Sequence, residues 1–278
     1  MNQHAAEVAA GARFEFGKNW ESFLETLNEK KIADAVASLQ SMLETESLAG
    51  RTFVDVGSGS GLFSLAARRM SARVHSFDYD PTCVRCTAEL KRRYFPDDEK
   101  WTVEGGSVLD SSYLESLGQF DVVYSWGVLH HTGQMWRALE NVAALVAPGG
   151  RLFISIYNDQ GTASRRWAKV KKFYNNAPSG LRFLAVWPSF LVLYWRRLVK
   201  DLLRGRPLQT IRGRQKTRGM SLWHDLIDWV GGYPFEVAKP EQIFNFYHER
   251  GFILTKLVTQ GGSLGCNEFV LKSAQLSR

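Results

Sequence analysis

A strand that leads into a glycine-rich turn constrains this chain more than any other feature. Residues 52–56 form a short apolar segment, and three glycines follow at alternate positions, Gly57, Gly59 and Gly61. Glycine lacks a Cβ and accepts positive φ, so such a turn bends sharply and lets a ligand approach the backbone. The spacing is GxGxG, whereas dinucleotide-binding folds use GxGxxG. The pattern predicts a strand–turn–helix unit with a ligand site at the turn.

Strands and helices alternate along the segment that follows. The expected elements are strands at 52–56, 73–78, 101–108, 120–125 and 151–157 and helices at 62–70, 83–94 and 134–146. This alternation is typical of βαβ units in a parallel sheet. A helix at 240–250 and an antiparallel pair at 252–259 and 266–272 then close a mixed sheet. We expect an α/β fold: a Rossmann-like, mostly parallel seven-stranded sheet, helices on both faces and an antiparallel last strand.

The expected organisation has four parts. Apolar residues recur at helical spacing over 14–48, so 1–50 is expected to form an N-terminal helical cap. The binding core follows at 51–159, a basic helical insertion and substrate lid at 160–238, and the C-terminal helix and hairpin at 239–278. No apolar run follows a basic start, and there are only three cysteines. Both observations favour a cytoplasmic protein.

Two carboxylates stand beside the glycine turn. Asp55 precedes Gly57 by two residues, and Asp78 ends the next expected strand. A carboxylate in that position can accept hydrogen bonds from both hydroxyls of a ribose. The alternative for Asp78 is an N-cap of the following helix, and the alternative for the glycines is a tight turn without a ligand.

Four motifs in order resemble the class I S-adenosylmethionine-dependent methyltransferases over residues 52–157. They are the glycine turn, Asp78, the strand 120–125 with Trp126-Gly-Val-Leu-His130-His131, and Pro148-Gly149-Gly150. The chain is most similar in pattern to the small-molecule O-methyltransferases of quinone biosynthesis, in which a Val-Leu-His-His run after the fourth strand is common.

The resemblance implies S-adenosyl-L-methionine as the cofactor and assigns it to matching positions. The implied cofactor-binding residues are Asp55, Gly57, Ser58, Gly59, Gly61, Asp78, Tyr79, Ser107, Val108, Ser125, Trp126 and Gly127. On this assignment the glycines lie under the methionine and ribose, Asp78 holds the ribose, and Tyr79 lies along the adenine. Asp55 orients the amino end, 107–108 meet the adenine edge, and 125–127 lie beside the sulfonium. Many relatives carry Asp where this chain has Ser107.

Methyl transfer requires an acceptor held in line with the sulfonium, and such positioning supplies about 7–11 kcal/mol. A neutral hydroxyl must also lose its proton, a step that suits histidine. The candidate catalytic residues are His131, His224, Asp225 and Tyr233. His131 follows the fourth strand, at the edge where such sheets bind ligands. The segment 221–236 would form a hinged lid or a surface loop with a buried tryptophan. We expect His131 or His224 to be the base. The alternative for His130 and His131 is one core and one solvated histidine.

No required metal is expected. Cys83 and Cys86 form a single CxxC, and a zinc site of that kind needs a second pair. Metal-dependent catechol methylation would require a carboxylate directly after the strand at 120–125, and the chain has none there.

The basic charge of the chain is concentrated in one segment. Residues 160–220 hold fifteen lysines or arginines and one acid, Asp201, although the whole chain carries a net charge of only +7. Within it, residues 183–195 form an apolar and aromatic run between arginines, too short to span a bilayer. Three interpretations stay open: a helical cap packed on the core or on a second subunit in a homodimer, an anionic membrane surface, and RNA.

The expected function is methyl transfer from S-adenosylmethionine to an oxygen of a small-molecule acceptor, which is lipid-linked, aromatic or sugar-like. One alternative is a tRNA wobble-base methyltransferase. A further alternative is a catalytically inactive peripheral membrane or scaffold protein. The expected location is the cytoplasm. The basic segment adds the alternative of peripheral attachment to the membrane.

Overall fold

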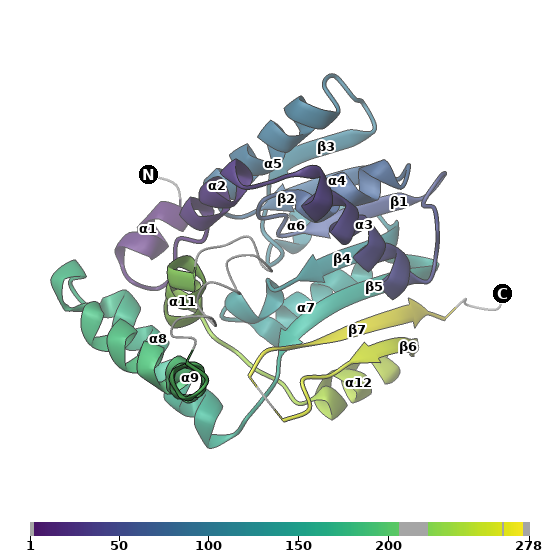
Figure 1. Cartoon of the computed structure of the whole chain (residues 1–278). Helices are drawn as coiled ribbons and strands as arrows, with labels where there is room; N and C mark the ends of the chain where they lie inside the picture. Colours follow the sequence, from purple (N-terminus) through teal and green to yellow (C-terminus); the bar gives the residue numbers. More distant parts are fainter. Residues whose placement is uncertain (1–2, 206–221, 263, 275–278) are drawn as a thin grey trace.

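The computed structural model describes residues 3–205, 222–262 and 264–274, with the backbone alone at 197–198 and 222–225. A seven-stranded sheet with the order β3-β2-β1-β4-β5-β7-β6 forms its centre (Figure 1). Its strands are β1 (Thr52–Val56), β2 (Arg73–Asp78), β3 (Trp101–Gly105), β4 (Phe120–Trp126), β5 (Val146–Tyr157), β6 (Phe252–Val258) and β7 (Cys266–Ser273). Strands β1 to β5 pair in parallel, and β7 runs antiparallel to both β5 and β6. The predicted fold class is confirmed.

Helices cover both faces of the sheet because its strands are apolar on both sides. Successive side chains of a strand point to opposite faces, so Phe53 and Val54 belong to different apolar clusters. One face packs against α6 (Ser111–Leu117), α7 (Met135–Ala144) and α12 (Pro240–His248), and the other against α3 (Glu29–Leu43), α4 (Leu62–Arg69) and α5 (Pro81–Tyr94). The sheet is therefore a rigid support for the loops at its carboxyl edge.

A third group of helices lies beyond that edge (Figure 1). It consists of α1 (Gln3–Ala9), α2 (Gly17–Glu25), α8 (Thr162–Asn176), α9 (Phe183–Leu203) and α11 (Leu222–Gly231). Trp167, Tyr174 and Val230 belong to the separate apolar cluster of α8, α9 and α11. The first two helices of the N-terminal cap and the insertion after β5 thus both lie next to the loops that follow the parallel strands.

Three expected boundaries are wrong. The strand expected at 101–108 already ends at Gly105. The helical region at 14–48 is interrupted between α2 and α3, because the Asn28 side chain accepts a hydrogen bond from the Lys31 N–H and starts a new helix. The last parallel strand begins at Val146 rather than at Arg151, so Pro148-Gly149-Gly150 lie within β5. The pairing register with β4 shifts between Phe120 and Val122 at this point.

Candidate active site

The glycine turn joins β1 to α4 in a conformation that favours glycine. Gly57 and Gly61 have φ of +79° and +80°, a region that side chains rarely adopt. A Cβ on Gly57 would lie 2.5 Å from Cγ1 of Val128, and one on Gly61 would lie 2.9 Å from Cα of Thr87. Side chains at these two positions are therefore excluded by the backbone conformation of the turn and by the neighbouring segments. The Ser58 hydroxyl ties the turn to α5 through Thr87, at 2.9 Å.

Asp78 stands at the end of β2, directly beside this turn. One carboxylate oxygen accepts a hydrogen bond from the Gly59 N–H and the other from the Asp80 N–H, each at 2.9 Å. Burial raises the pKa of Asp78 to about 6. A carboxylate oxygen has two acceptor positions, so this carboxylate can still accept from a diol. The N-cap of α5 is Asp80, which accepts from the Thr82 N–H. The N-cap alternative for Asp78 is therefore wrong.

Asp55 lies deeper, on β1 below the turn. It is almost fully buried and accepts a hydrogen bond from the Ser64 hydroxyl on α4. Burial raises the pKa of Asp55 to about 7, and the nearby negative charge of Asp78 adds to this. The expected contact of Asp55 with the amino end of a cofactor remains a prediction.

The N-terminal cap covers the glycine turn, and the sequence did not identify its contacts. The Gly17 N–H donates to the Asp80 carboxylate at 3.0 Å. The indole nitrogen of Trp20 lies 3.1 Å from the position that a Cβ on Gly59 would take. The Arg13 guanidinium lies 4.9 Å from the centroid of the Tyr79 ring. One face of Tyr79 is thus already engaged by this cap.

The remaining cofactor candidates divide between the core and the sheet edge. Ser107 accepts a hydrogen bond from the Leu109 N–H, and Val108 is buried in the apolar core. The Ser125 hydroxyl donates to the Val56 carbonyl at 2.9 Å and so links β4 to β1. The next residues, Trp126 and Gly127, reach the edge: Trp126 is 45% exposed, and Gly127 has a φ of +76°.

His131 has a defined tautomer on the turn after β4. Its Nδ1 lies 2.6 Å from the Pro234 carbonyl oxygen. A carbonyl only accepts, so Nδ1 carries the proton and Nε2 carries the lone pair. Burial lowers the pKa of His131 to about 3, and the positive charge of Lys171 contributes. The imidazole is therefore a neutral acceptor.

His130 is also buried, and neither of its ring nitrogens has a hydrogen-bond partner in the described part of the chain. Its ring packs 4.1 Å from that of Tyr157 and 4.5 Å from that of His131. The alternative of one solvated histidine is therefore wrong, because both rings lie inside the protein.

A buried lysine adjoins these histidines, and it is one of the fifteen basic residues of segment 160–220. Lys171 is 0% exposed, the only buried lysine or arginine among the described residues. Its ammonium donates to the Trp229 carbonyl and lies 4.6 Å and 4.8 Å from the ring centroids of Trp229 and Phe235. Burial lowers its pKa to about 7. The available signal was helical spacing, because Trp167, Lys171 and Tyr174 share the buried face of α8.

Comparison with known proteins decides the family. Residues 23–202 match a family model described as a methyltransferase domain, a range that contains the glycine turn, Asp78 and His131. The chain belongs to this methyltransferase family. The resemblance to class I methyltransferases inferred from the motifs is thereby confirmed.

Curated relatives match over part of their length. The methyltransferase is 33% identical over 118 residues to the ubiquinone biosynthesis O-methyltransferase of Methylobacterium sp. (strain 4-46), covering 42% of this chain and 45% of that protein. The protein of the same name from Xanthomonas oryzae pv. oryzae (strain PXO99A) is 34% identical over 111 residues, covering 40% and 45%. The matches thus span less than half of these relatives.

Solved structures support the fold. The magnesium protoporphyrin IX methyltransferase of Synechocystis PCC 6803 with bound SAH has a TM-score of 0.50 at 16% identity, with 88% of this chain and 83% of that one covered. An O-methyltransferase family protein from Burkholderia thailandensis has a TM-score of 0.50 at 15% identity, covering 88% and 59%. At these identities the likeness concerns the fold alone.

The expected lid of the methyltransferase contacts its N-terminal cap. The Tyr233 carbonyl accepts a hydrogen bond from the Phe14 N–H at 2.9 Å, and the Trp229 indole N–H is buried without a partner among the described residues. His224 and Asp225 belong to α11, but their side chains lie outside the described residues. Their catalytic roles therefore remain predictions.

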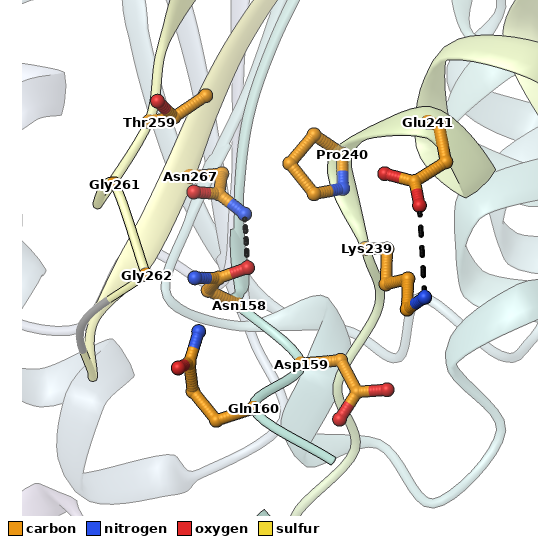
Figure 2. Close-up of a pocket in the computed structure, with 10 residues that line it drawn as sticks. All are labelled: Asn158, Asp159, Gln160, Lys239, Pro240, Glu241, Thr259, Gly261, Gly262 and Asn267. Atoms are coloured by element: carbon orange, nitrogen blue, oxygen red, sulfur yellow. Dashed lines mark hydrogen bonds and ion pairs between the residues drawn. The ribbon is translucent and has the colours of Figure 1, made fainter.

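A separate cleft of about 350 Å³ opens beyond the end of β5 (Figure 2). Its wall includes Asn158, the start of α12 at Pro240 and the turn between β6 and β7. The side chains of Asn158 and Asn267 hydrogen-bond to each other at 3.2 Å (Figure 2). The following residue, Glu268, accepts from the Trp126 indole N–H at 3.2 Å. The C-terminal hairpin therefore reaches the end of β4.

Proposed function

We propose that this methyltransferase binds S-adenosylmethionine at the carboxyl edge of β1, β2 and β4 and methylates an oxygen atom of a small-molecule acceptor. The observation that carries the proposal is the family match over residues 23–202, which contains the residues assigned to the cofactor and, of the catalytic candidates, His131. The names of the two ubiquinone biosynthesis relatives support oxygen as the methylated atom.

The chain has the features that an adenosyl cofactor requires at this edge. Two of its glycines place bare backbone at the turn after β1, and Asp78 offers acceptor positions for a ribose diol beside it. Gly127 has open space where a side chain would stand. When bound, the cofactor supplies a methyl group on a positively charged sulfur. The chain must therefore position the acceptor and receive its proton.

His131 suits the role of base by its tautomer and its position. Its Nδ1–H is held by the Pro234 carbonyl, so the basic Nε2 remains to take the proton of an acceptor hydroxyl. Burial lowers the pKa of His131, which keeps the ring neutral but also weakens it as a base. His224 is the alternative base.

The rings around His131 favour an aromatic acceptor over a sugar-like one. The rings of Phe16 and Tyr157 lie 5.0 Å and 5.5 Å from that of His131. Tyr157 in turn packs against Trp229 and Phe235. Aromatic side chains pair with flat rings by stacked or edge contacts, so a phenol or hydroxyquinone is the preferred class.

Cofactor binding is tested by calorimetry with S-adenosylmethionine. We expect Asp78→Ala to lose most of the affinity, and Asp34→Ala, an exposed acid on α3, to bind as the wild type does. Equal binding by Asp78→Ala would remove the assignment of the ribose site.

Transfer is tested with cofactor that carries a radiolabelled methyl group and a panel of catechols and hydroxyquinones. We expect label in an O-methyl product and a kcat lowered by about 10²–10⁴-fold in His131→Ala, with His248→Ala as the exposed control. Wild-type turnover in both His131→Ala and His224→Ala would refute the base assignment. Label in tRNA would favour the wobble-base alternative, and cofactor binding without transfer to any acceptor would favour the inactive scaffold.

A further inference from the structure

Helix α9 turns a large apolar face toward solvent. Nine of its large apolar side chains are between 44% and 81% exposed: Phe183, Leu184, Trp187, Leu191, Val192, Trp195, Val199, Leu202 and Leu203. Single exposed apolar residues are ordinary, but a contiguous stripe of this size marks an interaction surface. We call this set the apolar stripe.

The stripe is not needed to hold the helix in place. The opposite face of α9 carries Ala185, Val186 and Tyr194, which are buried in the cluster that α9 forms with α8 and α11. In Figure 1, α8 and α9 lie side by side on one flank of the molecule, away from the sheet. The packing of this flank thus fixes which side of α9 faces outward.

Basic side chains border the stripe. Arg196, Lys200 and Arg204 are exposed and follow one another at intervals of four, so they form a row along one side of the helix. Arg182 stands exposed just before the helix, while the acid Asp201 is buried. On α8, the exposed side chains include Arg165, Arg166, Lys169 and Lys172. The flank therefore combines an apolar face with positive charge.

We propose that this flank docks on the surface of a membrane that contains anionic lipid. The apolar stripe enters the boundary between headgroups and acyl chains, and the basic row lies among the phosphates. Exposed Trp187 and Trp195 suit this boundary, because tryptophan is enriched there. Among the described helices, none is long and apolar enough to cross a bilayer, so α9 lies on the surface.

The other occupants fit the flank less well. Symmetric pairing with a second copy through α9 would bring two basic rows together, and like charges oppose such an interface. RNA would engage the arginines and lysines, but it leaves most of a nine-residue aliphatic and aromatic stripe in water.

Docking would place the acceptor site close to the lipid. Helix α8 carries exposed basic residues on its outer side and Lys171 on its inner side, against the rings of Trp229 and Phe235. A helix with its side chains is about 10–12 Å across. The wall of the proposed acceptor site and the docking flank are thus two sides of one helix, which suits an acceptor delivered from the membrane.

The test is flotation of the full chain with vesicles of phosphatidylcholine alone or of phosphatidylcholine and phosphatidylglycerol in equal parts. We expect the wild type to float with the anionic vesicles and to be released as salt is raised. The variant Trp187→Ser/Leu191→Ser/Trp195→Ser should bind the anionic vesicles at least about tenfold more weakly than the wild type does. The matched control is Ile253→Ser/Leu257→Ser, which removes exposed apolar side chains from β6 and should float as the wild type does.

Each outcome decides. A wild type that stays unbound with both vesicles, or a triple variant that binds equally well, overturns the proposal. A dimer in light scattering that dissociates in the triple variant assigns the stripe to a second copy instead. Salt-sensitive RNA retention without flotation assigns the flank to RNA. The three substituted side chains are exposed, and thermal unfolding checks that the variant is folded. Because the assay contains no cofactor or acceptor, its result is independent of the proposed activity.

Discussion

Replacing Lys171 by methionine should stabilise the protein, because this lysine is folded into a place that disfavours its charge. Burial lowers its pKa from 10.5 to about 7, against a partial opposing effect of Asp228. Each pKa unit is worth about 1.36 kcal/mol, so holding the charged form in the native state costs about 5 kcal/mol. The variant loses the bond to the Trp229 carbonyl, about 1–3 kcal/mol, and the contacts with aromatic faces, about 2 kcal/mol. The expected net gain is about 1 kcal/mol near neutral pH.

The difference in stability between Lys171→Met and the wild type should depend on pH, and the direction of the pKa shift determines how. The native pKa of Lys171 lies below that of the unfolded chain. Between about pH 7 and about pH 10.5 the unfolded state therefore binds more protons, and the wild type gains stability as the pH rises. The penalty is complete below about pH 7, so the advantage of Lys171→Met is largest there and shrinks toward about pH 10.

The assay is urea unfolding followed by tryptophan fluorescence at about pH 6 and about pH 9. The control is Lys172→Met, because Lys172 is the exposed neighbour on the same helix and should show no pH-dependent difference. A Lys171→Met protein that is less stable than the wild type by about 1 kcal/mol at the lower pH, or a difference that does not change with pH, would refute the reasoning.

Three further substitutions probe the site. Gly57→Ala places a Cβ at positive φ against Val128 and should lower the free energy of unfolding by about 1–3 kcal/mol in chemical denaturation; unchanged stability would show that the turn has room. Lys171→Met also removes a positive charge that lowers the pKa of His131, so the acid limb of the kcat/KM profile should move to higher pH, and an unmoved limb would separate the two groups. Arg13→Ala removes the bond to the His131 carbonyl and the contact with Tyr79, and should speed cofactor dissociation in stopped-flow measurements about fivefold, whereas an unchanged rate would show that the cap does not retain the ligand.

The sheet and the glycine turn could be predicted because local rules determine them. Alternation of apolar segments with short loops specified the parallel strands, and the glycines marked the turn by their conformational freedom. The position of Asp78 followed from strand adjacency, because the ends of neighbouring parallel strands meet at one edge. The boundaries at 26–28 and 146–150 were missed, since a local side-chain cap and a register shift decided them.

The contacts that complete the site could not be predicted from one sequence. Arg13 and the His131 carbonyl are 118 residues apart in the chain, and no periodicity connects them. Lys171 and Lys172 are the same residue type and differ only in their position on the helix. The burial of Lys171 follows only from the packing of α11, which places the Trp229 carbonyl and ring beside its ammonium. The exposure of the apolar stripe likewise depends on which face of α9 the other helices occupy. These features follow from tertiary packing rather than from local pattern.

We expect the N-terminal cap to couple two events that could otherwise be independent, the release of spent cofactor and the entry of the next acceptor. Gly17 holds this cap to Asp80, beside the proposed nucleoside site, and Arg13 holds it to the carbonyl of His131. Departure of spent cofactor and entry of the next acceptor would then require the same displacement of the chain's first residues. We therefore expect an added N-terminal tag to slow repeated turnover more than it slows the first catalytic cycle.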